Sequence, residues 1–280
     1  MNIFKKVEEI CQKSKIASKK LSLVNSYEKN KGLEILSKNI LSSYEEILLE
    51  NKKDLEKAKK NSLSSSLINR LTLTSKSLDS IVKSINEIAK QPNPVGNIIE
   101  EWTQPNGLRF EKVSTPIGVI GIIYESRPNV TIDATCIALK SGNTVILRGG
   151  SDSYYSSNKL VEIMVKSFLE AELPQNIVQM IPTIEREAVD HLIQMKEYVD
   201  IIIPRGGKSL IEKINSQSKI PVIKHLDGIC HLYIDKEANL EKAKKVIFNS
   251  KLRRPEICGA TETLLIDEQL KDSVLNLLQP

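Results

Sequence analysis

The sequence predicts an α/β fold, in which a parallel sheet follows a helical region and an extended β-hairpin. Apolar residues recur at helical spacing in the first ninety residues, and two strand-like runs flank an Asn-Gly pair at residues 106–107. From about residue 116 onward, short apolar runs alternate with amphipathic helical runs. Parallel strands need crossover connections, which are usually helices, so this alternation predicts a sheet with helices on both faces.

The helical region contains three runs in which apolar residues fall on one face. They are Ile3, Phe4, Val7, Ile10 and Cys11; Leu36, Ile40, Tyr44 and Ile47; and Leu78, Ile81, Val82, Ile85 and Ile88. The third run ends before Pro92 and Pro94, which cannot continue a helix. The serines at 62–66 predict a loop that also caps the following helix.

A β-hairpin is expected between the helical region and the sheet. The strand-like runs 98–104 and 108–114 flank Pro105-Asn106-Gly107, and an Asn-Gly pair between two such runs is the strongest short hairpin signal. The hairpin contains Trp102, which is the single tryptophan of the chain. It is either a surface ribbon or an arm that pairs with another subunit, and the residues alone leave both interpretations open.

After the hairpin, the periodicity places short strands and helices in turn. The expected strands are 118–124, 144–147, 177–180, 199–203 and 221–223, and the expected helices are 130–139, 156–168, 186–194 and 208–215. A strand-like run at 229–234 and a helix at 240–251 follow, then a loop at 253–259, a strand at 263–266 and a weak helical run at 270–278.

The composition excludes several classes of protein. Of the 280 residues, 40% are hydrophobic, which is enough for a core and excludes wholesale disorder. The net charge of +5, from 40 basic and 35 acidic side chains, is too small to indicate nucleic-acid binding. No apolar run approaches the ~20 residues of a membrane span, and the N-terminus lacks the apolar stretch of a secretory signal. Four cysteines without a C-x-x-C pair indicate a reducing compartment, so we expect a cytoplasmic protein.

Two junctions between a strand and a helix carry paired glycines beside basic residues. They are Arg148-Gly149-Gly150-Ser151 and Arg205-Gly206-Gly207-Lys208. Ligands bind at the carboxyl ends of parallel strands, and the bare N–H groups at a helix start attract phosphate. Glycine pairs also make tight turns with arginine solvated at the rim, but finding two such junctions in one sheet favours an anionic ligand. The dinucleotide fingerprint G-x-G-x-x-G is absent.

Among the four cysteines, Cys258 is the candidate nucleophile. It follows Arg253 and Arg254 in a loop and precedes the small residues Gly259 and Ala260. Positive charge favours a thiolate, and small neighbours leave room for an acyl carbon. A structural loop cysteine is the alternative. The other cysteines are expected to be small buried hydrophobes: Cys11, Cys136 and Cys230.

A metal site is not expected. His225, Cys230 and His231 lie close in sequence, but their spacing matches no common zinc pattern. Adjacent residues of a strand also point to opposite faces, so Cys230 and His231 would not converge on one ion.

Six segments in order resemble one known family. They are EEWTQPNGLR at 100–109, PIGVIGIIYESRPNVT at 116–131, KSGN at 140–143 running to VILRGGS at 145–151, IPRGGK at 203–208, HLDGICH at 225–231, and RP at 254–255 through Cys258 to ETLL at 262–265. The sequence resembles the gamma-glutamyl phosphate reductase (glutamate-5-semialdehyde dehydrogenase) family of the aldehyde dehydrogenase superfamily. The resemblance runs from the N-terminus to about residue 267.

The resemblance implies an aldehyde dehydrogenase-like fold with a Rossmann-type parallel sheet, and a reaction of proline biosynthesis. NADPH would reduce L-glutamyl 5-phosphate to L-glutamate 5-semialdehyde, with release of phosphate. Cys258 matches the family's nucleophile, which forms a thioester, and Asn129 matches the superfamily's oxyanion-hole asparagine. Glutamate 5-kinase would be the upstream enzyme.

Two departures from hydrolytic aldehyde dehydrogenases follow from the same resemblance. Those enzymes have Glu-Leu-Gly-Gly where this chain has His225-Leu226-Asp227-Gly228, so the carboxylate that activates water is missing and the thioester is spared for hydride. They also place Lys-x-x-Glu where this chain has Arg148 to Ser151. Serine beside arginine suits a 2′-phosphate, which favours NADPH over NADH. Gly259 replaces the family's usual asparagine, a small change that should leave the thiol in place.

The same comparison predicts the domain organisation. Residues 1–97 form the helical part of the cofactor domain, 98–115 the hairpin arm for oligomerisation, 116–236 the NADP-binding α/β domain, and 237–280 the start of the catalytic domain. Family members continue well past this point, so we expect an incomplete catalytic domain, with a homo-oligomer for the full-length protein. The alternatives are an inactive truncated remnant or a nucleotide-binding module without turnover; a third hypothesis, a hydrolytic aldehyde dehydrogenase, requires NAD-dependent acid formation.

Overall fold

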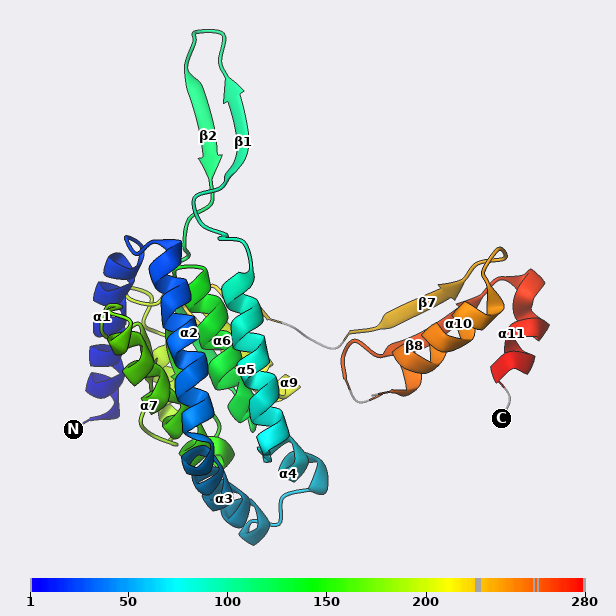
Figure 1. Cartoon of the computed structure of the whole chain (residues 1–280), viewed down its shortest axis with the longest axis horizontal. Coiled ribbons are helices and arrows are strands. Elements are labelled where there is room, and N and C mark those ends of the chain that lie inside the picture. The colour runs from blue at the N-terminus through cyan, green and yellow to red at the C-terminus, as the bar shows by residue number, and fades with distance from the viewer. Residues whose placement is uncertain (1, 225–227, 254, 256, 279–280) are drawn as a thin grey trace. The chain divides into compact units, whose positions relative to one another are not determined.

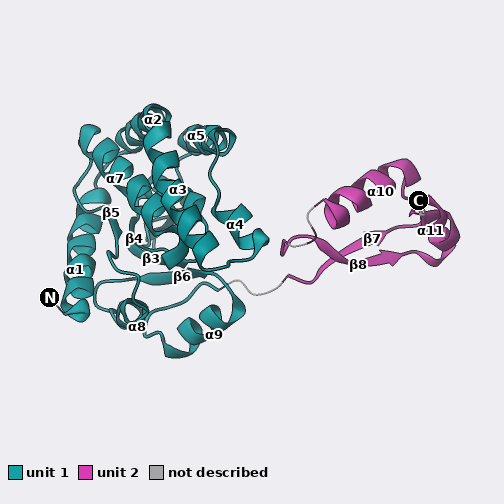
Figure 2. Ribbon diagram, turned by 90° about the horizontal axis from the view of Figure 1, so that it is seen from below, with its two compact units in different colours: residues 1–224 teal, residues 225–280 magenta. Residues whose placement is uncertain are grey.

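The computed structural model describes residues 2–224, 228–253, 255 and 257–278. The chain divides into two compact units, Met1–Lys224 and His225–Pro280, which Figure 2 colours separately. The first unit contains a four-stranded sheet with a core on each face and a separate two-stranded hairpin, and the second unit contains a two-stranded sheet with one core.

The sheet of the first unit has four parallel strands. These are β3 (Val119–Tyr124), β4 (Thr144–Arg148), β5 (Val178–Met180) and β6 (Ile201–Arg205), in the order β5-β4-β3-β6. The chain adds β4 and β5 on one side of β3 and then crosses to place β6 on the other side, as in doubly wound sheets. The strand expected at 221–223 is reduced to a single parallel bridge between Val222 and Ile202.

Helices cover both faces of this sheet (Figure 2). One face carries α1 (Ile3–Leu21), α8 (Glu187–Leu192) and α9 (Lys208–Gln217). The other carries α2 (Ser26–Ser42), α3 (Tyr44–Lys60), α5 (Ser75–Lys90), α6 (Pro128–Lys140) and α7 (Tyr154–Glu170), with α4 (Ser65–Leu71) beside α3. The predicted α/β fold is therefore confirmed.

The residues of β3 show how the two cores are separated. Ile120, Ile122 and Tyr124 pack with the helices of the larger core, whereas Val119 and Ile123 pack with α1 and α8. Successive side chains of a strand point to opposite faces, so a continuous apolar strand serves two cores. All six residues of β3 are buried.

The helical region behaves as its periodicity predicts. Helix α5 buries the five apolar residues that the periodicity places on one face, from Leu78 to Ile88, and it ends at Lys90, before the two prolines. Its start is capped reciprocally by Thr74 and Ser77, a capping box that satisfies two N–H groups of the first turn.

The expected hairpin is present as β1 (Ile98–Thr103) and β2 (Arg109–Val113), joined by a turn with Gly107 at φ +87°. Every residue of both strands is exposed, and the ribbon extends away from the rest of the first unit (Figure 1). Trp102 and Phe110 face each other in register, with ring centroids 5.3 Å apart and planes 7° from parallel. This ribbon lacks most of the burial that stabilises strands, and a two-stranded hairpin without such burial is only marginally stable.

The second unit pairs β7 (Cys230–Ile234) in parallel with β8 (Thr261–Ile266). Helix α10 (Leu240–Ile247) continues as a π-turn through Phe248–Leu252, and α11 (Lys271–Leu278) closes the unit. Its core contains Ile234, Ala243, Ile247 and Val274. The second compact unit begins at His225, and β7 pairs with β8 within it. The predicted domain bounds, with 116–236 as one domain and 237–280 as the next, stay predictions.

No helix among the residues that the structure describes combines the length and the apolar character needed to cross a bilayer.

Gly118 and Asp200 join the start of β3 to the segment before β6. Asp200 accepts the N–H of Val119 at 2.8 Å and pairs with Lys15 of α1 at 2.7 Å. Gly118 has φ +125°, and a Cβ at this position would overlap the Asp200 carboxylate. The carboxylate can therefore reach Val119 only because residue 118 has no side chain.

We expect Gly118→Ala to lower the free energy of unfolding by ~2–3 kcal/mol, because it combines backbone strain with a clash at an ion-paired carboxylate. Urea unfolding followed by circular dichroism measures this change. Gly107→Ala is the matched control, since Gly107 also has a positive φ but open space around it, and it should have a smaller effect. Equal losses for the two variants would contradict the role assigned to Asp200.

Candidate active site

The carboxyl ends of β3 and β6 form the switch point of the first sheet, since the chain leaves them toward opposite sides. Tyr124 pairs with Arg205, and the Glu125 N–H donates to the Arg205 carbonyl at 3.1 Å. Ser126 follows with φ +36°, a conformation that costs energy for a residue other than glycine. Open α/β sheets bind ligands at this position, and backbone strain is often found at functional sites.

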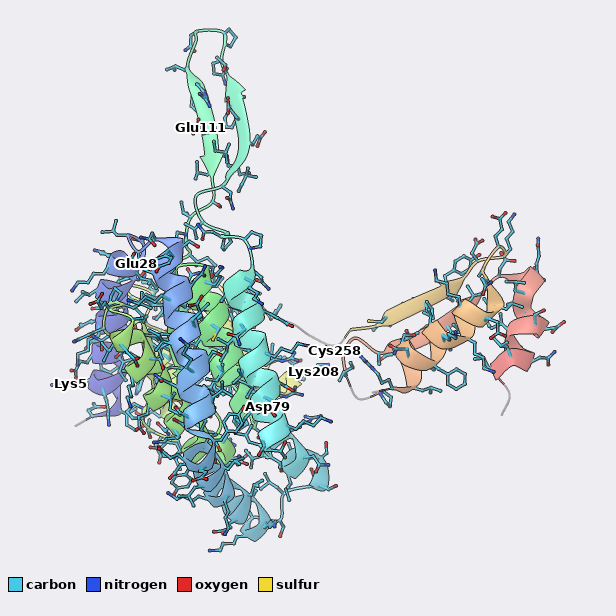
Figure 3. All side chains as sticks on the ribbon, in the orientation of Figure 1. Lys5, Glu28, Asp79, Glu111, Lys208 and Cys258 are labelled. Carbon is cyan, nitrogen blue, oxygen red and sulfur yellow. The ribbon has the colours of Figure 1, made fainter. Side chains whose placement is uncertain are left out.

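At this point the segment Arg205-Gly206-Gly207-Lys208 leads from β6 into α9. A Cβ on Gly206 would lie 2.8 Å from the Glu125 carboxylate and from Leu210, so these side chains would have to move to admit one. Gly207 is the N-cap of α9 and offers no side-chain cap, while Arg205 and Lys208 are exposed. Lys208 is labelled in Figure 3. The segment therefore presents positive charge and a helix start, as predicted.

The sequence did not reveal that Glu125 already interacts with this helix start. Its carboxylate accepts the Gly207 N–H at 2.9 Å. A phosphate at this place must use the other amides of the first turn or displace the carboxylate, because two anions do not share one donor favourably.

The other glycine pair lies at the carboxyl end of β4, next to β3. A Cβ on Gly150 would lie 3.2 Å from the Ser126 nitrogen, and one on Gly149 would lie 3.2 Å from the Tyr124 ring. Ser151 begins a 3-10 turn, and its carbonyl accepts from Lys57 at 3.3 Å. The two glycine junctions thus follow β4 and β6, the strands on either side of β3, and their glycines let these loops pack closely against Tyr124, Glu125 and Ser126.

The sequence left open whether Arg148 is a solvated cation at the rim of a tight turn, and in the structure it is not solvated. Its guanidinium is buried and donates to the carbonyls of Gly149 at 2.8 Å, Ile184 at 2.9 Å and Glu185 at 3.3 Å. Burial lowers its pKa, and the nearby charge of Arg186 adds to this effect. Arg148 therefore ties β4 to the 184–185 loop. Arg186 and Lys57 are cations that sequence reasoning missed, because neither directly follows a strand.

Asn129 lies in the first turn of α6. Its amide nitrogen donates to Asp133 at 3.2 Å, one helical turn further on. Burial raises the pKa of Asp133, and the Asn129 hydrogen bond opposes that shift. An asparagine amide has two N–H donors, so one remains for another acceptor while Asp133 orients the group.

Cys258 lies in the loop before β8 of the second unit (Figure 3). Its side chain is exposed, and its carbonyl accepts from the Cys230 thiol at 3.5 Å. A Cβ on Gly228 would overlap that carbonyl, whereas one on Gly259 would meet no atom within 4 Å. The backbone of Cys258 is thus held closely on one side, and the space beside Gly259 is open.

The other cysteines follow the predictions in part. Cys11 and Cys136 are buried as expected, but Cys230 is only half-buried, which corrects the prediction that it is a core residue. Its contact with Cys258 depends on the β7–β8 pairing, which the sequence did not reveal. The predictions for residues 225–227 and for Arg254 lie outside the described residues.

No group of three histidine, cysteine, aspartate or glutamate side chains that could hold a metal ion occurs in the described part of the chain.

The sequence profile of the aldehyde dehydrogenase family matches residues 5–280. The chain belongs to the aldehyde dehydrogenase family. Two curated relatives, both named gamma-glutamyl phosphate reductase, come from Brucella suis and Bartonella quintana. The first is 47% identical over 268 residues and the second 44% over 273 residues, covering 95% and 97% of this chain and 64% and 66% of the relatives.

Solved structures agree with this family. The gamma-glutamyl phosphate reductase of Thermotoga maritima has a TM-score of 0.90 at 38% identity, over 98% of this chain and 66% of that one. The yeast enzyme of the same name has a TM-score of 0.73 at 32% identity, over 96% and 68%. The predicted aldehyde dehydrogenase-like fold is confirmed, and the chain spans 64–66% of the length of the two curated relatives.

We expect iodoacetamide to alkylate Cys258 at least ~100-fold faster than Cys11 or Cys136 in the folded chain at pH 8. Burial raises the pKa of Cys11 to about 12, with a smaller contribution from Glu8, and burial also raises that of Cys136. Both thiols therefore stay protonated and inaccessible, and peptide mass spectrometry after brief exposure measures the difference. The urea-unfolded chain, in which all four thiols should react at similar rates, is the control. Equal rates in the folded chain would be incompatible with this structure.

Proposed function

We propose that this chain acts as an NADPH-dependent gamma-glutamyl phosphate reductase in proline biosynthesis. It would reduce L-glutamyl 5-phosphate to L-glutamate 5-semialdehyde with release of phosphate. The supporting observation is the exposed Cys258 on a closely held loop, in a chain 44–47% identical to reductases of that name. A reducing, cytoplasmic setting suits a reaction that needs a free thiol.

In the proposed mechanism, the Cys258 thiolate attacks the acyl carbon of the substrate. A carbon–sulfur bond forms, the carbon–oxygen bond to phosphate breaks, and inorganic phosphate leaves with the bonding electrons. Asn129 would donate its second amide N–H to the developing oxyanion, together with the Cys258 N–H. One such donor contributes ~3–4 kcal/mol of barrier lowering.

The two glycine junctions of the first unit fit a dinucleotide. Arg205 and Lys208 are exposed at the start of α9, and the first-turn amides of α9 lie beside them, although the Glu125 carboxylate already accepts the Gly207 N–H. Gly149, Gly150 and Ser151 would hold one part of the cofactor, and the segment 205–208 another. When bound, NADPH supplies the hydride that turns the thioester into an aldehyde, and Cys258 recovers its thiolate.

The preference for NADPH over NADH is proposed from Ser151. Residue 151 itself has no carboxylate to repel a 2′-phosphate, and Arg186 and Lys57 lie near the β4 end. The adjacent Asp152 carboxylate accepts from the hydroxyls of Ser126 and Ser151. An engineered glycolyl-CoA reductase with bound NADP+ shares the fold at a TM-score of 0.68 and 16% identity, over 97% of this chain and 58% of that one. The fold is thus compatible with that dinucleotide.

We expect Ser151→Glu to weaken NADPH binding about tenfold or more and to change NADH binding much less, because ~1.4 kcal/mol of charge repulsion gives that ratio. Quenching of protein fluorescence during titration with each cofactor measures both affinities. Ser151→Ala is the matched control, since it removes the hydroxyl without adding charge. Equal losses of NADPH and NADH affinity in Ser151→Glu would show that the residue does not face the 2′-phosphate.

We expect Cys258→Ala to lower the phosphate-dependent reduction of NADP+ by glutamate 5-semialdehyde by a factor on the order of 10³ or more. NADPH binding should be unchanged, and Cys230→Ala should keep most of the activity. An unchanged rate in Cys258→Ala would exclude the thioester route. NADPH binding without turnover in the wild-type chain would instead support the nucleotide-binding module. Acid formation without phosphate would support a hydrolytic enzyme.

We further propose that the β1–β2 ribbon pairs with a second copy of the chain. The support is that both faces of the ribbon are exposed, including the stacked Trp102 and Phe110. An acyl phosphate is prone to hydrolysis, so glutamate 5-kinase, the enzyme that would supply it, is the other proposed partner.

A further inference from the structure

Two lysine side chains are buried at the amino ends of the strands of the first sheet, whereas the candidate active site lies at the carboxyl ends. Lys140 ends α6, directly before β4, and Lys29 lies on α2. Only 4% of Lys140 and 3% of Lys29 are exposed, whereas lysines are almost never buried without a partner of opposite charge. The pair therefore needs a physical explanation.

The two ammonium groups differ in their partners. Lys140 donates to the Asn30 side-chain carbonyl at 2.7 Å and to the Ala89 carbonyl at 2.8 Å, near the end of α5. Within the residues that the structure describes, Lys29 forms no hydrogen bond from its side chain and no ion pair, and Lys140 forms no ion pair. The Lys29 nitrogen lies 3.8 Å from the Cβ position of Gly142, in the turn between α6 and β4.

The charges of the two lysines are close enough to affect each other. Burial lowers the pKa of Lys29 and the positive charge of Lys140 lowers it further, while burial also lowers the pKa of Lys140. Folding thus brings together two like charges that lose water without gaining a carboxylate. This arrangement is unfavourable unless a negative group is added.

The donors that remain free suit a small anion. An ammonium has three N–H donors; Lys140 uses two, and Lys29 uses none within the described chain. Unlike Arg148 Nε, which is fully enclosed and has no partner, the Lys29 nitrogen keeps some contact with solvent. A larger ligand does not suit two side chains that are almost entirely covered.

We propose that Lys29 and Lys140 form a binding site for a small multivalent oxyanion such as phosphate or sulfate. The anion bridges the two ammonium groups, accepts their free N–H donors and removes their mutual repulsion. The site joins α2 to the end of α6, so its occupation stabilises the first unit from the side remote from the proposed cofactor site. This inference does not depend on the proposed reaction.

Thermal unfolding of the whole chain, with inorganic phosphate titrated against sodium chloride at constant ionic strength, tests the site. We expect a saturable rise of the midpoint by ~2–4 °C in the wild type, as ligand linkage requires, with sulfate acting similarly and acetate weakly. Lys29→Met should remove most of this rise, and it should also unfold at a higher temperature without phosphate, since it deletes an unpaired buried charge.

Two controls locate the effect. Lys38→Met changes an exposed lysine of the same helix, and Lys208→Met changes the proposed cofactor site; both should keep the wild-type response to phosphate. If Lys29→Met does not fold, Lys29→Gln replaces it and should likewise lose the response. A flat or non-saturating response in the wild type would overturn the proposal. So would a full response in the Lys29 variants or its loss in Lys208→Met.

Discussion

The candidate cofactor site depends on the central position of β3 in the first sheet. Because β4 pairs on one side of β3 and β6 on the other, the loops that follow these three parallel strands begin close together at their carboxyl ends. Side chains on those loops would fill the edge, so glycine occurs where the loops approach most closely. Gly150 accommodates the backbone at Ser126, and Gly206 accommodates Glu125. The glycines thus allow these loops to pack closely at the carboxyl ends of the strands, which is where the cofactor is proposed to bind.

The carboxyl ends of these strands can be predicted well from the sequence, because periodicity identifies the strands and each glycine pair directly follows one. The N-terminal helices and the hairpin are predictable for the same reason, because each has a local signal in apolar spacing, proline or Asn-Gly. Features that depend on pairing between distant segments are not predictable in this way. The pairing of β7 with β8 is such a feature, and so is the contact between Cys230 and Cys258 that accompanies it.

Charged residues show the limit of local reasoning most clearly. Position in sequence marks Arg148 and Glu125 only as polar residues after strands, yet one is a buried anchor for three carbonyls and the other accepts an amide of α9. Lys29 and Lys140 are 111 positions apart, and neither lies within an apolar run that periodicity identifies. Their proximity is a property of helix packing, which residue spacing does not encode.

The anchoring role of Arg148 has a consequence for how cofactor choice could change over evolution. A guanidinium that holds the 184–185 loop to β4 cannot be exchanged without loosening that loop, whichever dinucleotide the protein uses. Ser151 lies at a helix start, has a short side chain and forms no comparable anchor. Lineages that shift their coenzyme should therefore diversify at position 151 and at surface positions such as 186, while arginine persists at 148.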